Sequence, residues 1–288
     1  MISVVILTFN SEKYISACLD SIFSQNGKKL EVIVVDNGSK DKTKECVKKH
    51  PGKPILIENQ KNFGPCLGRN IGIKQSRGDW ILTLDCDITL EKGFFKNIKQ
   101  HLKNTPENIG MLQPKILNAN TSSIYSCGVQ LCWSRRFYDI GANSTVSKFA
   151  SDSLKHVFGC CAAAAFYRRS MLEQLCDSHG YFDERFFFFV EDVDLAWRAQ
   201  KKGWRALFME DASCFHIGNS STYDPKLRQF LCFRNRAYTI FKNEGLIKYA
   251  AKLLPLLCYD FPRFMYLMMT NPYMRRRNMR QGVLPGDG

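Results

Sequence analysis

The stretch Asp79-Trp80-Ile81-Leu82-Thr83-Leu84-Asp85-Cys86-Asp87 decides how this sequence of 288 residues is interpreted. Its apolar and β-branched middle predicts a buried strand that ends in two carboxylates. Residues two apart on an extended chain point to the same side, so Asp85 and Asp87 can aim at one point beyond the strand end. Two converging carboxylates can hold a hard cation that binds phosphate oxygens, whereas two loop aspartates that cap a turn are the alternative.

Strands and helices are predicted to alternate ahead of this stretch. Apolar, β-branched runs predict strands at residues 2–7, 30–35 and 54–58. Each run is followed by a predicted helix, at residues 11–25, 40–50 and 65–76. Short links between alternating strands and helices indicate an α/β fold with a parallel sheet and right-handed crossovers.

Polar side chains follow the predicted strands at their carboxyl ends. These residues are Thr8, Asn10, Asp36 and Asp85. The carboxyl ends of parallel strands lie at one edge of the sheet, where α/β proteins bind their ligands. Scattered loop polarity accounts poorly for such residues at a single edge, so a ligand site is expected there.

Short motifs in this half of the sequence resemble those of the family 2 glycosyltransferases of the GT-A fold. They are Val4–Asn10, Val34–Ser39, Asn62–Gly64 with Arg69–Gly72, and Asp85–Asp87. The similarity resumes over Gly159–Ser221. It implies a Rossmann-like, mainly parallel sheet flanked by helices, and an enzyme that uses a nucleoside-diphosphate sugar.

The resemblance also implies roles for individual residues. Asp36 would bind the base of the nucleotide, and Asp85 with Asp87 would engage the ribose, the metal and the diphosphate. The nucleotide-binding residues that it implies are Thr8, Asn10, Asp36, Arg69 and Asp85. The metal ligands that it implies are Asp85, Asp87 and His216, a set that suits Mn²⁺ and tolerates Mg²⁺. For Arg69, a solvated position on the surface of a helix is the alternative.

Glu191 and Asp192 stand where an aromatic run, residues 186–190, meets a predicted helix. The helix dipole by itself favours carboxylates at that position. Apolar surroundings would also raise their pKa and make either carboxylate a better base. The resemblance implies that Asp192 is the general base and that Glu191 assists it. Asp194 and Arg198 are four residues apart and are expected to form an ion pair on the helix surface.

The middle of the chain carries fewer signals. A helix is predicted at residues 92–102, strands at 109–117, 123–131 and 206–209, and a long loop at 133–148. The small residues at 159–163 permit close approach of the backbone. They fit either a strand packed beneath a helix or a contact with a bound sugar.

Basic residues are in excess, with a formal net charge of +14 and a pI of about 9.3, which indicates anionic partners. From Asp224 onward, lysines and arginines alternate with apolar and aromatic residues, and Pro255 and Pro262 break any long helix. Basic amphipathic helices are typical of proteins that bind an anionic membrane surface. A helical subdomain packed on the core, or a homo-oligomer contact, is the alternative.

We therefore expect a catalytic domain at residues 1–222 and a basic, amphipathic helical extension at residues 223–288. The twelve cysteines lack Cys-x-x-Cys spacing and several lie in apolar runs, which is typical of a reducing cytosol and not of a zinc site. No signal peptide is recognised, and the longest apolar runs are too short to span a bilayer. A cytoplasmic protein on the inner face of the cytoplasmic membrane is the prediction.

These features together predict a metal-dependent, inverting glycosyltransferase. By the resemblance, it would move a hexose or a deoxyhexose such as rhamnose from a UDP- or dTDP-sugar. The acceptor would be a glycan or a polyprenyl-diphosphate-linked glycan in bacterial cell-surface polysaccharide synthesis. A protein acceptor, and a non-catalytic scaffold that binds nucleotide-sugar or lipid, are the alternatives. Nucleic acid is not expected as a partner, because the strand-end carboxylates would repel its phosphates without a metal.

Overall fold

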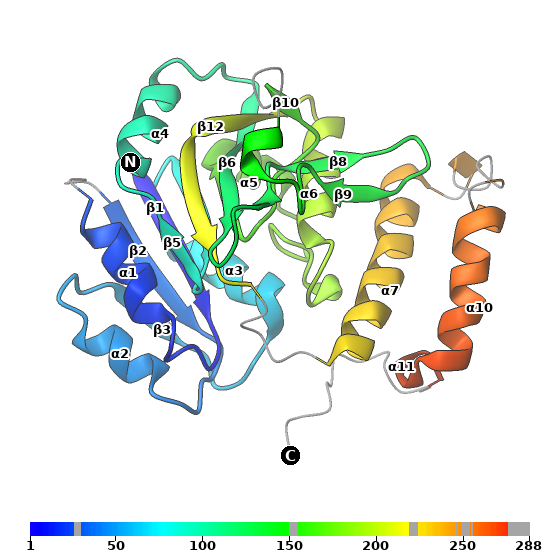
Figure 1. Ribbon diagram of the computed structural model, residues 1–288, viewed down its shortest axis with the longest axis horizontal. Coiled ribbons are helices and arrows are strands. Elements are labelled where there is room, and N and C mark those ends of the chain that lie inside the picture. The colour runs from blue at the N-terminus through cyan, green and yellow to red at the C-terminus, as the bar shows by residue number, and fades with distance from the viewer. Residues whose placement is uncertain are drawn as a thin grey trace.

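The computed structural model describes residues 1–25, 30–149, 155–218, 224–245, 247–248, 254 and 256–275. A large central sheet carries helices on both faces, and a group of C-terminal helices lies at one side of it (Figure 1). That group contains α7 (Pro225–Glu244), α10 (Phe261–Thr270) and α11 (Pro272–Arg275). A separate two-stranded sheet lies between the central sheet and α7 in the same view.

The first half of the central sheet is parallel, as predicted. Its strands are β1 (Ile2–Thr8), β2 (Leu30–Asp36), β3 (Ile55–Glu58) and β4 (Trp80–Asp85). They are joined by α1 (Ile15–Phe23), α2 (Thr43–Lys49) and α3 (Gly64–Gln75). The strand order β3-β2-β1-β4 brings the carboxyl ends of all four strands to one edge. The expected parallel α/β fold is thereby confirmed for this half.

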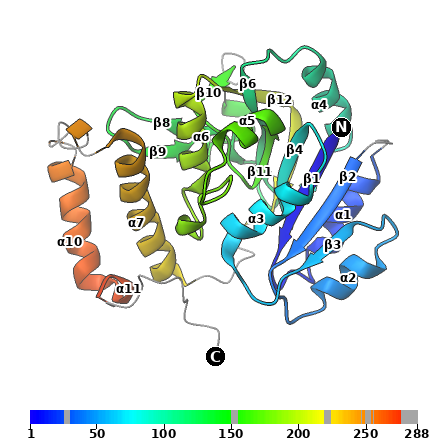
Figure 2. The same ribbon diagram turned by 180° about the vertical axis from the view of Figure 1, so that it is seen from behind.

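Alternate residues of each strand pack against helices on opposite faces. Val4 and Ile6 join the apolar cluster with α1 and α2, whereas Val5 joins the cluster with α3. Gly72 permits the close contact of α3 with β1, because a Cβ atom there would lie 2.3 Å from Cγ1 of Val5. Figure 2 shows the α3 face, which also carries α5 (Arg169–Leu175) and α6 (Glu191–Lys201). The other face carries α4 (Phe94–Lys103).

The second half of the sheet is mixed. Its long strands are β6 (Ile109–Asn118), β11 (Ala164–Arg168) and β12 (Arg205–His216). β11 is antiparallel to both of its neighbours, β4 and β6, and β12 is parallel to β6. Short strands complete this half, namely β5 (Ile88–Leu90), β7 (Ile124–Ser126) and β10 (His156–Val157). β12 is longer than predicted and contains an irregularity between Met209 and Ser213.

Two predictions for the segment after β6 are wrong. The strand expected at residues 123–131 is broken at Gly128, whose φ of +111° is unsuited to a continuous strand. Its second part is β8 (Val129–Leu131), which pairs with β9 (Phe137–Asp139) in the separate small sheet. The loop expected at residues 133–148 therefore contains a strand, and it ends in the 3-10 turn η1 (Val146–Lys148).

From Asp224 onward, most of the residues that the structure describes form helices. A π-helical segment, η3 (Leu256–Asp260), precedes α10. Pro262 lies in the first turn of α10, where a missing N–H costs no helical hydrogen bond. Pro255 and the residues around the predicted boundary at 222/223 lie outside the described residues, so the division into two domains stays a prediction. Within the part of the chain that is described, no helix has both the length and the apolarity needed to cross a bilayer.

Candidate active site

The end of β4 and the end of β12 bring together the three predicted metal ligands. β5 follows directly after Asp87 and pairs with β12, so that Ile88 lies opposite His216. Nε2 of His216 is 3.2 Å from Oδ1 of Asp87. One ligand atom from each of Asp85, Asp87 and His216 lies within 4.8 Å of the others. Strands from opposite halves of the sheet thus build one cluster, called the strand-end cluster below.

The surroundings of the strand-end cluster favour a cation. Burial raises the pKa of Asp85, although the charge of Arg69 opposes that shift. Burial by itself would lower the pKa of His216, but the hydrogen bond and the charge of Asp87 outweigh it and raise the pKa. Nδ1 of His216 is buried and has no hydrogen-bond partner among the described residues. Two carboxylates beside an imidazole fit Mn²⁺, and also Mg²⁺, as a ligand set.

Arg69, on α3, joins the strand-end cluster to Glu191, the neighbour of the predicted base. Its side chain is only 4% exposed, so the solvated position considered for it is wrong. Nη2 lies 2.9 Å from Oδ1 of Asp85, and Nη1 lies 2.6 Å from Oε1 of Glu191. One buried guanidinium thus neutralises a carboxylate on each side of the site. A contact between Arg69 and a nucleotide stays a prediction.

Glu191 and Asp192 begin α6, as predicted, and differ in exposure. Glu191 is buried, and burial raises its pKa to about 7 against the opposing charge of Arg69. Asp192 is half-buried, and burial raises its pKa as well. Its Oδ2 accepts a hydrogen bond of 3.2 Å from the backbone N–H of Ala162. A partly accessible carboxylate with a raised pKa is suited to take up a proton.

The turn in front of this pair has an unusual backbone. Phe187, Phe189 and Val190 have φ values of +64°, +66° and +72°. Such left-handed conformations cost about 1–3 kcal/mol each for residues other than glycine, and they occur frequently at functional sites. The aromatic run at residues 186–190 therefore forms a strained turn before Glu191, although its composition favours an extended strand.

Three of the five predicted nucleotide-binding residues, Thr8, Asn10 and Asp36, lie at the edge formed by β1 and β2. Asp36 is fully buried, and its Oδ1 accepts hydrogen bonds from the backbone N–H groups of Gly38 (3.1 Å) and Ser39 (2.8 Å). The hydroxyl of Thr8 donates to its Oδ2 over 3.0 Å. Asn10, with a φ of +50°, accepts through Oδ1 from the backbone N–H of Lys40. Their predicted contacts with a base are not tested by this geometry.

The sequence did not single out two further groups beside the site. Burial raises the pKa of Asp139 to about 6, and the negative charge of Asp192 adds to that shift. The ring of Tyr125 meets the ring of His216 edge-on, with 4.3 Å between the centroids. Asp139 lies in the segment predicted as a loop, so its burial could not be anticipated. No sequence signal distinguishes Tyr125 from other aromatic residues.

Asp194 is not part of a surface ion pair. Its side chain is fully buried, and Arg198 donates to Oδ2 through Nε over 2.8 Å. Lys242 and Asn243, both on α7, donate to the same carboxylate over 2.8 and 2.9 Å. The ion pair between Asp194 and Arg198 was predicted correctly. Its predicted location on the surface was wrong, because α7 covers this side of α6.

The small residues at 159–163 include a packing contact. A Cβ atom on Gly159 would lie 2.3 Å from Cβ of Ala196, so only glycine lets this segment pass beneath α6. The close-packing interpretation therefore holds at Gly159. Three residues further on, the N–H of Ala162 donates to Asp192, as does the N–H of Val193.

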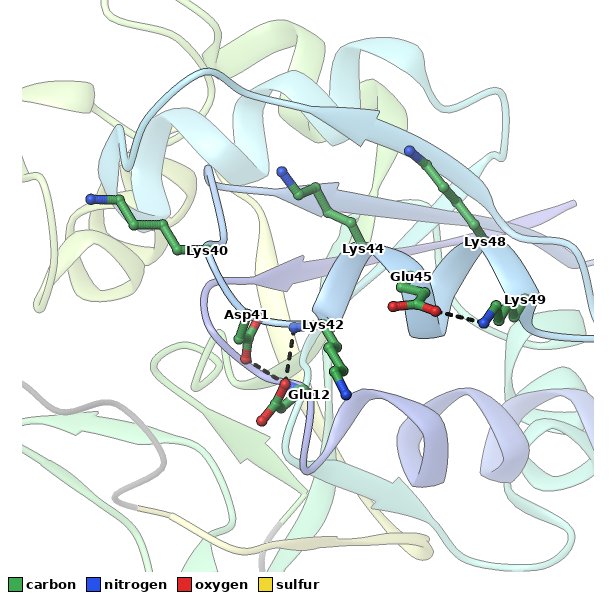
Figure 3. A pocket seen from close by; sticks show the side chains of 8 residues that line it. All are labelled: Glu12, Lys40, Asp41, Lys42, Lys44, Glu45, Lys48 and Lys49. Carbon is green, nitrogen blue, oxygen red and sulfur yellow. Dashed lines mark hydrogen bonds and ion pairs between the residues drawn. The ribbon is translucent and has the colours of Figure 1, made fainter.

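A lysine-rich depression of about 700 Å³ lies beside α2 (Figure 3). It is lined by Glu12, Lys40, Asp41, Lys42, Lys44, Glu45, Lys48 and Lys49. Several of these charges are already paired, with Lys49 at 2.5 Å from Glu45 and Lys48 at 2.8 Å from Glu58. None of the residues that line it belongs to the strand-end cluster or to the Glu191–Asp192 pair. We interpret the depression as a solvated, charged helix face.

The model of the Glycosyl transferase family 2 matches residues 3–176, which is more than half of the chain. The chain belongs to glycosyl transferase family 2. The family predicted from the sequence is therefore confirmed. The match covers the parallel half of the sheet, the strand-end carboxylates and β11, and it ends before Glu191.

Curated relatives of this family 2 chain include much longer proteins. Glycosyltransferase GlyA of Streptococcus pneumoniae is 24% identical over 67% of the chain, which spans 29% of that protein. Poly(ribitol-phosphate) beta-N-acetylglucosaminyltransferase TarS of Staphylococcus aureus is 33% identical over 40% of the chain and 21% of its own length. The chain thus spans less than a third of either relative. EpsJ of Bacillus subtilis, an uncharacterised glycosyltransferase, is 24% identical over 85% of the chain and 70% of its own length.

Solved structures of glycosyltransferases share the fold. The structure of S. aureus TarS 1–349 aligns over 96% of the chain and 75% of its own, with a TM-score of 0.57 and 22% identity. The mannosyltransferase PcManGT of Pyrobaculum calidifontis, solved with GDP-Man and Mn²⁺, aligns over 93% and 75%, with a TM-score of 0.60 and 18% identity. These similarities confirm the GT-A fold predicted from the sequence.

Proposed function

We propose that this family 2 chain is an inverting glycosyltransferase that uses a nucleoside-diphosphate sugar. The observation that supports this most strongly is the pair of carboxylate groups joined by Arg69. On one side Asp85 belongs to a cluster suited to a cation, and on the other Glu191 precedes a partly exposed Asp192. Diphosphate and acceptor hydroxyl are the two groups that such an arrangement can serve.

The strand-end cluster would bind the diphosphate side of the donor. Asp85, Asp87 and His216 would hold Mn²⁺ or Mg²⁺, and the bound cation would supply positive charge to the departing diphosphate. Asp36, with Thr8 beside it, would contact the base of the nucleotide. Asn10 and Arg69 complete the proposed nucleotide-binding set, to which Asp85 also belongs.

Asp192 would act on the acceptor. Its carboxylate takes the proton of an acceptor hydroxyl, and that oxygen forms a bond to the anomeric carbon from the face opposite the diphosphate. The bond from the anomeric carbon to the phosphate oxygen breaks in the same step, so the configuration inverts. Glu191, bonded to Arg69 through Oε1, would keep a carboxylate beside the base or bind acceptor hydroxyls. A single base suffices for this direct displacement.

We propose a UDP- or dTDP-linked hexose or deoxyhexose, rhamnose included, as the donor sugar. The acceptor would be a glycan or a polyprenyl-diphosphate-linked glycan of a cell-surface polysaccharide. TarS has been solved with UDP and with UDP-GlcNAc, and its name gives a poly(ribitol-phosphate) acceptor, which supports a UDP-sugar and a surface polymer. Uracil and thymine present the same hydrogen-bonding edge, so the proposal includes both bases.

The C-terminal helices would attach the enzyme to the inner face of the cytoplasmic membrane. Apolar side chains of η3 and α10 are exposed, including Leu257 (54%), Phe261 (56%), Tyr266 (58%) and Met269 (71%). The formal charge of +14 favours an anionic surface. Co-sedimentation should occur with vesicles that contain phosphatidylglycerol and not with pure phosphatidylcholine. No sedimentation with either vesicle, together with a stable dimer in light scattering without lipid, would favour the homo-oligomer contact instead.

A thermal-shift screen tests the proposed activity most broadly. UDP, dTDP, GDP and their common sugars are added with and without Mn²⁺ at concentrations well above the expected Kd. A ligand at a hundred times its Kd stabilises a protein by about 2.7 kcal/mol, which gives a measurable shift. We expect UDP or dTDP derivatives to stabilise the protein only when Mn²⁺ is present. If no nucleotide gives a shift with any divalent cation, the proposal is wrong.

A further inference from the structure

The strained turn in front of Glu191 needs support from outside itself. Three of its residues, Phe187, Phe189 and Val190, have positive φ values. Left-handed backbone of this kind persists only where the surrounding structure holds it. The turn leads directly into the first helical turn of α6, because the N–H of Asp194 already bonds to the carbonyl of Val190 over 3.1 Å. Any relaxation of the turn would therefore move the start of α6.

Asn235 of α7 supplies much of that support. Its side chain is 1% exposed, and Nδ2 donates to the carbonyl oxygens of Phe186 (3.1 Å), Phe188 (2.7 Å) and Phe189 (2.8 Å). All three partners are acceptors, which requires the amide nitrogen, and not its oxygen, to face the turn. Arg234 adds a bond of 2.8 Å from Nη2 to the carbonyl of Phe186. Adjacent residues of one helix thus bind the backbone of the turn.

The opposite side of the turn is held by α3. The N–H of Cys66 donates to the carbonyl of Phe187 over 3.3 Å. Gly64, with a φ of +83°, lies so close that a Cβ atom there would be 2.5 Å from Cδ2 of Phe187. The turn is therefore enclosed between α3, which carries Arg69, and α7, which lies beside α6 (Figure 1).

We propose that Asn235 is a positioning residue, which holds the strained turn so that Asp192 points at the acceptor. The inference rests on the proposed role of Asp192 as the base. It also gives α7 a part in the active site, although α7 belongs to the segment predicted as a C-terminal extension. Asn235 is too deeply buried to touch substrate itself, so it acts only through the backbone of the turn.

Asn235→Ala tests this inference. Turnover is measured with whichever of UDP-GlcNAc, UDP-glucose and dTDP-rhamnose the unmodified protein uses fastest, and UDP affinity is measured by calorimetry with Mn²⁺. We expect kcat to fall at least tenfold while the Kd for UDP changes less than twofold, because the strand-end cluster lies on other elements. If the alanine variant does not fold, Asn235→Ser, which keeps one donor, should give a smaller fall in kcat with the same unchanged Kd.

Asn271→Ala is the matched control. Asn271 is also a fully buried asparagine whose Nδ2 donates to a backbone carbonyl, that of Lys226 at the start of α7, over 2.8 Å. Its loss removes a similar bond from the same helix without touching the turn, so kcat should stay within twofold. Unchanged kcat in Asn235→Ala, or a parallel loss of UDP affinity, would overturn the positioning role. Full activity of Asp192→Asn would instead overturn the proposed base, whatever Asn235→Ala does.

Discussion

The two carboxylate pairs of the site are placed by different kinds of structure. Asp85 and Asp87 follow a regular strand, and ordinary pairing of β5 with β12 brings His216 beside them. Glu191 and Asp192 follow a turn with successive left-handed residues that α3 and α7 hold from either side. The backbone position of the first pair is set by the sheet, whereas that of the second depends on helices that lie far away in the sequence.

The two carboxylate pairs also differ in the groups that are bonded to them. Asp85 and Asp87 have positive or chargeable partners, Arg69 and His216, at 2.9 and 3.2 Å. The hydrogen-bond donors to Asp192 in the described part of the chain are backbone N–H groups, and burial raises its pKa. A pair that is neutralised by cations is suited to hold charge in place. Burial raises the pKa of Asp85 and of Glu191 as well, but both are bonded to Arg69. The partly exposed Asp192 is therefore the carboxylate best suited to exchange a proton, so separate tasks for the two pairs follow.

The largest effect is expected for Asp192→Asn. Loss of a general base lowers turnover by about 10²–10⁴-fold, because no other group takes the acceptor proton. The fall should be seen as slower release of nucleoside diphosphate from the donor that the screen identifies. Turnover within a factor of three of the unmodified protein would show that the base lies elsewhere.

Arg69→Met should break the link between the two pairs. It leaves Asp85 and Glu191 without their shared counter-charge, and removal of one partner from a buried ion pair costs about 3–5 kcal/mol of unfolding free energy. Chemical denaturation measures that loss. The double variant Arg69→Met/Glu191→Gln should recover part of it, since one uncompensated charge is also removed. A loss below about 1 kcal/mol in Arg69→Met would contradict a structural link through this side chain.

Asp87→Asn should affect only the strand-end cluster. Replacing a charged ligand by an amide is expected to weaken Mn²⁺-dependent UDP binding at least as much as the loss of a supporting partner, about 10–100-fold. Chelation of metal from the unmodified protein by EDTA should have a similar effect. Binding of UDP that is indifferent both to this substitution and to EDTA would exclude a cation at these residues.

The pH dependence of turnover should report the second pair. Burial raises the pKa of Asp192, and that of Glu191 to about 7, so the pair holds a proton in mildly acidic solution. Since the base must be deprotonated, turnover should fall as the pH drops below that range, by about tenfold per unit for one proton. Glu191→Gln removes a neighbouring negative charge and should move the acid limb to lower pH. A flat profile between pH 5 and 8 is not compatible with this pair as the base.

The parallel half of the sheet could be predicted from the sequence because its signals are local. Each strand is a continuous apolar run and each helix follows within a few residues, so β1 to β4 and the edge where Asp36 and Asp85 lie were expected. The mixed half depends on pairing over long distances, such as the insertion of β11 between β4 and β6. Gly128 broke a predicted strand because its positive φ is a consequence of tertiary structure.

The candidate site was predictable in part for the same reason. The strand-end carboxylates and the start of α6 lie in short motifs, whereas His216 was expected only from the family resemblance, because the predicted strand stopped at Met209. The burial of Arg69 could not be predicted from the sequence, because it results from the packing of α3 against α6. The strained turn could not be predicted either, since phenylalanine and valine favour extended backbone. Contacts with α3 and α7 hold these residues in the left-handed conformation.

Separate tasks for the two carboxylate pairs are tested most directly by one calorimetric experiment. UDP is titrated with Mn²⁺ into the unmodified protein, Asp192→Asn and Asp87→Asn, each also assayed for turnover. We predict that Asp192→Asn binds UDP with unchanged Kd while being inactive, and that Asp87→Asn loses Mn²⁺-dependent binding. Equal losses of UDP affinity in both variants, or none in either, would contradict the division of tasks.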